Sequence, residues 1–256
     1  MSDPRIDTVT GVELGLGLIG IGRPWPTDAH PVSSPDRAFA LLDRALELGI
    51  RFLDTAAAYG ASECVLGEYL RNLSADRRAR LLVATKCGES WSAEDGSVVD
   101  HSVPALQASL DRSTALLGDI DLLQLHKCTG ADFLDDALLG WLEAVKKDGR
   151  VGAIGISVSS VDALTRALDC ELVDAVQFPG NTANTVLTDV FAGGQRDCLP
   201  IVNRPMASGA LVGDPAAFDF HAARFRRAVV LTGTTDPAHL VANERAFAEA
   251  LARTTS

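Results

Sequence analysis

The chain has 256 residues, of which 47% are hydrophobic, so it is long enough to bury a large core. Its net charge of −11 argues against a nucleic-acid partner, because proteins that bind nucleic acids normally carry clustered lysine and arginine. Its five cysteines are odd in number and lack any C-x-x-C pair, which predicts a reducing compartment and no metal site. Because it has neither a secretory leader pattern nor an apolar run of membrane-spanning length, we expect a cytoplasmic protein without a membrane partner.

Short apolar runs with the character of β-strands alternate with helical patterns along the chain. In chain order the strand-like runs cover residues 14–20, 51–56, 81–86, 121–126, 153–157, 175–178, 201–205 and 229–233. Helical apolar spacing is clearest at residues 38–49, 62–70, 103–118, 138–147, 161–168 and 239–252. This alternation indicates repeated βα units and a parallel sheet.

Eight βα units of about 30 residues each predict an α/β fold, a closed (β/α)8 TIM barrel that forms one domain over residues 1–256. An open doubly wound sheet is the alternative, and Gly15, Gly17 and Gly20 do match the pattern G-x-G-x-x-G. These glycines lie within an apolar run and not in a turn that opens a helix, so we interpret them as strand packing in a barrel.

Ionisable side chains follow three of the predicted strands. Asp54 and Tyr59 follow the second strand, Lys86 closes the third, and His126 closes the fourth. Because the C-terminal ends of barrel strands meet at one face, we expect these four side chains to lie together in an active site. A lysine beside Tyr59 is expected to lower the tyrosine pKa below its ordinary value of about 10, since positive charge favours the phenolate.

These residues resemble the aldo-keto reductase superfamily. The motifs that carry the resemblance occur in the family's order over nearly the whole chain: LGLGLIGIG, LELGIRFLDTAAAYG, LLVATK, DIDLLQLH, KKDGRVGAIGIS, RPMASGALVG and TGTTDPAHLVAN. The resemblance implies NAD(P)H-dependent reduction of an aldehyde or ketone. It also implies that Tyr59 protonates the carbonyl oxygen, that Lys86 and Asp54 tune Tyr59, and that His126 directs the carbonyl toward the nicotinamide.

The last βα unit carries a second signal. Asp236 and Pro237 have the types expected at a helix N-cap and first turn, so the preceding residues would face a phosphate at a helix N-terminus. The resemblance implies that this segment grips the adenosine phosphate and that residues after earlier strands hold the nicotinamide. The expected cofactor-binding residues are Ser157, Gln177, Asn203, Arg204, Gly233, Thr234, Thr235, His239 and Asn243.

Several positions depart from the family pattern. Val158 replaces an asparagine that helps to bind the carboxamide, and Asn203 stands where the family often has a tyrosine or a basic residue. Gly233 and His239 replace a frequent lysine and arginine, which weakens the expected clamp on a 2′-phosphate. We therefore expect NADPH as the cofactor and keep NADH possible.

Trp25 and Trp91 lie in the first and third strand-to-helix loops and are candidate walls of the substrate pocket. The expected partner is a small-molecule carbonyl substrate, whose identity and physiological direction stay open together with the oligomeric state. Two alternatives remain: an NAD(P)-dependent dehydrogenase that oxidises an alcohol or lactol, and a cofactor-binding regulatory subunit with little turnover.

Overall fold

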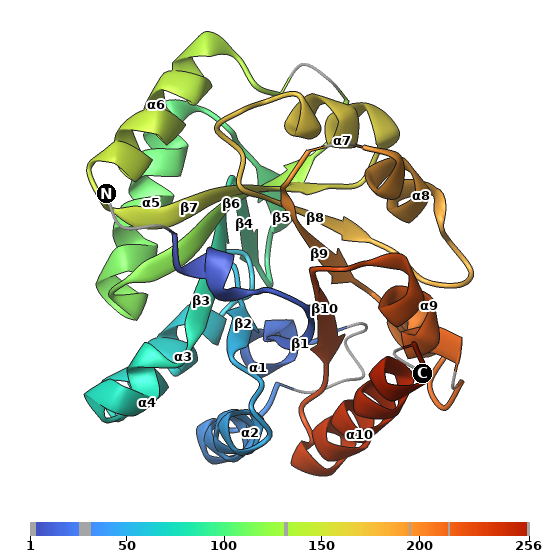
Figure 1. Ribbon diagram of the computed structural model, residues 1–256. Helices are drawn as coiled ribbons and strands as arrows, with labels where there is room; N and C mark the ends of the chain where they lie inside the picture. The colour runs from blue at the N-terminus through green and yellow to red at the C-terminus, as the bar shows by residue number, and fades with distance from the viewer. Residues whose placement is uncertain (1–3, 26–31, 131–132, 195, 215, 255–256) are drawn as a thin grey trace.

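The computed structural model describes residues 4–25, 32–130, 133–194, 196–214 and 216–254. Within these ranges, eight parallel strands close into a barrel in the order β1-β10-β9-β8-β7-β6-β3-β2, and helices surround it (Figure 1). The predicted (β/α)8 TIM barrel is therefore confirmed. The barrel strands are β1 (Val12–Gly17), β2 (Phe52–Asp54), β3 (Leu82–Cys87), β6 (Ile120–Cys128), β7 (Val151–Val158), β8 (Ala175–Pro179), β9 (Leu199–Asn203) and β10 (Ala228–Gly233).

The principal outer helices are α2 (Pro35–Glu47), α3 (Ser62–Arg71), α5 (Val103–Leu117), α6 (Asp136–Lys147), α7 (Val161–Leu168), α8 (Val186–Gly193), α9 (Ala216–Arg224) and α10 (Pro237–Thr254). Shorter pieces are α1 (Ile19–Gly22), α4 (Ala75–Ala79), the 3-10 turns η1 (Arg5–Thr8) and η2 (Ala207–Gly209), and a hairpin of β4 (Glu89–Ser92) and β5 (Gly96–Val99). None of the helices in the described ranges is long and apolar enough to cross a membrane.

Two apolar layers hold the barrel together. The inner layer fills the barrel with side chains such as Phe52, Leu122 and Ile201, all fully buried. The outer layer lies between strands and helices and includes Leu41, Leu42 and other apolar positions of the helical repeat. This packing explains why the buried strands read as apolar runs while the helices show one-sided spacing.

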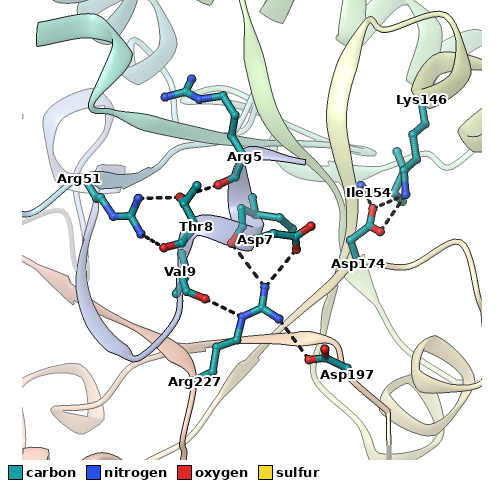
Figure 2. A network of polar contacts seen from close by, with 11 residues as sticks. Arg5, Asp7, Thr8, Val9, Arg51, Lys146, Ile154, Asp174, Asp197 and Arg227 are labelled. Atoms are coloured by element: carbon teal, nitrogen blue, oxygen red, sulfur yellow. Dashed lines mark hydrogen bonds and ion pairs between the residues drawn. The ribbon is translucent and has the colours of Figure 1, made fainter. Parts of the chain in front are cut away.

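The N-terminal end of the barrel is covered by η1, which lies across it (Figures 1 and 2). Arg227 donates from Nε to the carbonyl oxygen of Val9 at 2.7 Å and contacts Asp7 at 3.3 Å and Asp197 at 3.1 Å (Figure 2). Arg51 donates to Thr8 from two nitrogens, each at 2.7 Å. Backbone oxygens and carboxylates at this end are thus satisfied by guanidinium donors.

Several strand boundaries differ from the prediction, and β1 and β9, which border the site, are two examples. The run 14–20 ends as a strand at Gly17, and Gly20 lies in the one-turn helix α1. The run 201–205 ends at Asn203, because Arg204 adopts a φ of 55°. Gly15 does serve strand packing, since a Cβ there would lie 2.7 Å from Val229 Cγ1.

Candidate active site

A buried ion pair organises the C-terminal face of the barrel. Lys86 Nζ, on β3, lies 2.6 Å from Asp54 Oδ2 at the end of β2 and donates to the carbonyl oxygen of Thr55 at 2.9 Å. It also approaches the Tyr59 hydroxyl at 3.4 Å. Gln124 donates to the other Asp54 oxygen at 3.1 Å. The structure therefore brings the predicted Asp54, Tyr59 and Lys86 into direct contact.

The turn that carries Tyr59 is held by a close backbone approach to α1. Ala61 N donates to the carbonyl oxygen of Gly22 at 3.0 Å, and Gly60 has a φ of +60°. A Cβ on Gly22 would lie 1.9 Å from the carbonyl oxygen of Tyr59, so only glycine permits this contact. The first βα loop thereby fixes where the tyrosine points.

The expected direction of the Tyr59 pKa is wrong. Desolvation by burial raises the pKa of Tyr59 above its ordinary value, and the positive charge of Lys86 offsets only part of this effect. Burial also disfavours the charged form of Lys86, but Asp54 and Tyr59 outweigh it and raise the lysine pKa. At neutral pH the pair is therefore a protonated phenol beside an ammonium.

His126 packs edge-on against Tyr59, with ring centroids 5.8 Å apart and an interplanar angle of 74°. Its Nδ1 lies 2.8 Å from Oε2 of Glu89, a carboxylate with no exposed side-chain surface on the hairpin that follows β3. The contact is close but not an aligned hydrogen bond, since neither Glu89 oxygen has a bonded partner. Burial would raise the pKa of Glu89, but contacts with His126 lower it to about 2.

The protonation of His126 follows from the same surroundings. Burial lowers the pKa of His126 although Glu89 acts in the opposite direction, so the ring is neutral near pH 7. The adjacent Lys127 lies 3.7 Å from the other oxygen of Glu89 and has a φ of 59°. Here the register of β6 against β7 shifts, as in a β-bulge, which re-aims the strand-end side chains.

A cavity of about 1050 Å³ opens over this cluster and extends toward the N-terminus of α10. Asp54, Tyr59 and His126 lie at its wall, while Lys86 is buried beneath them. Every residue predicted to bind the cofactor lines it: Ser157, Gln177, Asn203, Arg204, Gly233, Thr234, Thr235, His239 and Asn243. The structure thus gathers the predicted catalytic and cofactor positions around one space.

Two amide oxygens in the cavity wall have no partner. Gln177 donates from Nε2 to Asp54 at 3.4 Å, but its Oε1 is buried and unbonded, as is Oδ1 of Asn203. Val158 also lines the cavity and offers no polar side-chain atom there. Unsatisfied buried acceptors of this kind fit the N–H donors of a carboxamide.

The far end of the cavity is built by α10 as expected. Asp236 caps the helix by accepting from Ala238 N at 2.8 Å, and Asn243 donates to Thr232 at 2.7 Å. Arg37 of α2 lies 4.0 Å from Asp236 Oδ2 and lines the cavity, a cation that the sequence analysis missed. It lies on an exposed helix position, where a charge is ordinarily read as solvated surface.

The predicted substrate walls are placed differently from each other. Trp25 lines the cavity as predicted, whereas Trp91 does not line it and packs against Arg23, whose Cζ is 5.1 Å from the Trp91 ring centroid. Arg23 and Glu89 both line the cavity and were missed by the sequence analysis. A hairpin signal for Glu89 existed, because Gly96, with a φ of 72°, ends a three-residue loop between two strands, which is a common hairpin connection.

Comparison with known proteins agrees with this geometry. The family model "Aldo/keto reductase family" matches residues 13–214. An aldo-keto reductase from Gibberella moniliformis is 31% identical over 206 residues, which cover 78% of this chain and 60% of that protein. A Schizosaccharomyces pombe protein named aldo-keto reductase yakc [NADP(+)] is 27% identical over 232 residues, covering 86% of this chain and 65% of that protein.

The chain thus spans less than two thirds of the length of each of these curated relatives. A structure from Pseudomonas aeruginosa, described as an aldo-keto reductase, superposes with a TM-score of 0.78 at 30% identity. The match covers 93% of this chain and 90% of that one. The chain belongs to the aldo-keto reductase family.

Proposed function

We propose that this protein reduces an aldehyde or ketone to an alcohol with NADPH as the hydride source. The observation that carries the proposal is the contact of the Tyr59 hydroxyl with Lys86, which is itself paired with Asp54, at the wall of a large cavity. A bound nicotinamide supplies the hydride, and the protein supplies orientation and protons.

Tyr59 is the proton donor in this mechanism. Its raised pKa keeps the hydroxyl protonated at neutral pH, so it can give a proton to the carbonyl oxygen as that oxygen gains negative charge. The Lys86 ammonium then lies 3.4 Å from the phenolate oxygen that is left, and stabilises it. Asp54 holds the lysine in place at 2.6 Å.

His126 would orient the carbonyl in its protonated form, and Glu89 sets which ring nitrogen carries the proton in the neutral form. A carboxylate beside Nδ1 favours a proton on that nitrogen, which leaves Nε2 as an acceptor in the neutral ring. Nε2 donates to a carbonyl oxygen only when the ring is protonated. Because burial lowers the pKa of His126, this protonated form becomes common only below pH 6.5.

The cavity residues fit a nicotinamide cofactor. The free oxygens of Gln177 and Asn203 would accept from its carboxamide, and the N-terminus of α10 would face its adenosine phosphate. Arg37 would replace the cations missing at Gly233 and His239. We therefore propose that NADPH is preferred over NADH and that Arg37 provides much of the preference.

The test combines turnover with binding. Purified protein is mixed with NADPH or NADH and 4-nitrobenzaldehyde, and oxidation is followed by the loss of reduced-nicotinamide absorbance. We expect turnover with both cofactors, faster at limiting concentrations of NADPH. Replacing Arg37 by methionine should raise the Kd for NADPH more than that for NADH. The absence of turnover by the wild-type protein with either cofactor would contradict the proposal.

A further inference from the structure

Arg23 is a buried cation that the proposed reaction does not use. It follows the one-turn helix α1 in extended backbone geometry, and only 8% of its surface is exposed. Its guanidinium lies among three aromatic rings, with Cζ 5.1 Å from the centroid of Trp91, 5.9 Å from that of Trp25 and 6.0 Å from that of Tyr59. Arg23 is therefore held next to the proposed proton donor.

The aromatic frame leaves the guanidinium short of hydrogen-bond acceptors. Nη1 of Arg23 is buried and has no hydrogen-bond partner. In the described ranges, no carboxylate lies within ion-pair distance of Arg23. Ring faces attract a cation but do not bond the N–H groups in the guanidinium plane. A buried donor of this kind, at the wall of a cavity, is suited to a hydrogen-bond acceptor on a ligand.

Most other charges that line the cavity in the described ranges are paired, and the exposed Arg204 is the exception. Lys86 is paired with Asp54 at 2.6 Å, and Lys127 approaches Glu89 at 3.7 Å. At the far end, Arg37 and Asp236 lie 4.0 Å apart. The charge at the Tyr59 end is therefore left positive by the buried Arg23, in a chain whose net charge is −11.

We propose that Arg23 binds an anionic group of the substrate, and that this group is a carboxylate on the same small molecule as the reacting carbonyl. A planar guanidinium matches a carboxylate through two parallel hydrogen bonds, which a point charge such as lysine does not reproduce. The inference rests on the proposed function, because Tyr59 places the carbonyl and Arg23 the carboxylate. The substrate class is thus an oxo acid with the two groups separated by a short linker.

The first experiment compares matched substrates. The value of kcat/KM is measured with 4-oxobutanoate and with its uncharged methyl ester. We expect the acid to be favoured at least tenfold, mainly through KM. Arg23→Met should remove this ratio and Arg23→Lys should keep part of it, while the matched control Arg245→Met, on an exposed face of α10 outside the cavity, should leave the ratio unchanged. An equal kcat/KM for acid and ester in the wild type would overturn the proposal, as would a ratio that depends on Lys127 and not on Arg23.

A second pair of substrates, which carries a phosphate in place of the carboxylate, identifies the anion. Glyceraldehyde 3-phosphate and glyceraldehyde are compared in the same way, and a larger preference in this pair than in the carboxylate pair would overturn the assignment of a carboxylate. We expect the carboxylate pair to show the larger preference.

A binding measurement separates this proposal from the reaction itself. Succinate, which cannot be reduced, is titrated against the full chain and followed by tryptophan fluorescence, since Trp25 and Trp91 flank the guanidinium. Saturable binding that is weakened at least tenfold in Arg23→Met supports the anion site even if no aldehyde is reduced. Reduction of neutral aldehydes without Arg23-dependent succinate binding would overturn the anion site and leave the proposed function standing.

Discussion

The two ends of the barrel differ in whether their polar groups have hydrogen-bond partners. At the N-terminal end, the guanidinium groups of Arg51 and Arg227 bond the backbone and carboxylates of the segment that covers the barrel. At the C-terminal end, buried atoms of Arg23, Gln177 and Asn203 have no partner. Since an unbonded buried polar group costs free energy, the first arrangement stabilises the fold and the second is suited to a ligand.

Strained backbone conformations also distinguish the two ends, because they occur at the cavity end. The non-glycine residues with positive φ in the described ranges are Lys127, near the C-terminal end of β6, and Arg204, Ala207 and Ser208, which follow β9. Such conformations persist where the surrounding structure enforces them, and they cluster at functional sites. The comparison predicts that substitutions at the cavity end alter activity, whereas those at the covered end alter stability.

After the loss of the Tyr59 hydroxyl itself, the largest effect is expected from Lys86→Met. Without the ammonium, the phenolate of Tyr59 is no longer stabilised, and kcat for aldehyde reduction should fall by about 10² or more. Lys86→Arg serves as the control that keeps the charge. Rates are measured from pH 5 to 9 on protein with native circular dichroism, and an unchanged kcat with an unchanged pH profile would show that the lysine is structural.

Arg227→Met tests the covered end. It removes the donor to Val9 and the contacts with Asp7 and Asp197. The free energy of unfolding should therefore fall by about 2 kcal/mol, since charge-assisted hydrogen bonds contribute ~1.5–3 kcal/mol each and this group is partly exposed. Urea unfolding measures the change. A loss of kcat/KM with unchanged stability would contradict the claim that the covered end serves stability and not activity.

Glu89→Gln should lower the rate of reduction about tenfold, that is by ~1.4 kcal/mol in the barrier, because the buried carboxylate 2.8 Å from His126 Nδ1 is lost. The carboxylate raises the pKa of His126, so its removal should move the acid limb of the pH–rate profile further below pH 6.5. The Glu89 pKa of about 2 also means that its stabilising charge is present above pH 4.5 and lost as the pH falls toward 2. In Glu89→Gln, the free energy of unfolding should therefore fall less as the pH drops from 4.5 to 2. An acid limb of the pH–rate profile that does not move would contradict the role assigned to Glu89.

His221 of α9 gives the smallest effect. Burial lowers its pKa to about 4, and neither ring nitrogen has a hydrogen-bond partner. Because the folded pKa is depressed, its stabilising contribution is present above pH 6.5 and is lost as the pH falls toward 4. We expect the free energy of unfolding to fall by about 1 kcal/mol between pH 8 and 6 from this group. His221→Leu should flatten that slope without changing the pH–rate profile.

The sequence predicts the barrel and the cluster of Asp54, Tyr59, Lys86 and His126 because parallel strands place their C-terminal ends together. It does not predict that the Tyr59 pKa is raised, because the sequence shows the neighbouring lysine but not how deeply the tyrosine is buried. Arg23 follows a single helical turn without periodicity, and Arg37 occupies an exposed helix position. Both depend on long-range packing that brings separate loops to one cavity.

Tyr59→Phe tests the central claim most directly, because it removes one hydroxyl and no cofactor contact. The measurement is single-turnover oxidation of bound NADPH by 4-nitrobenzaldehyde, with the Kd of NADPH and the urea midpoint determined on the same protein. The account predicts a rate lower by about 10²–10⁴ with nearly unchanged cofactor affinity and stability. A rate equal to that of the wild type would contradict the assignment of Tyr59 as the proton donor.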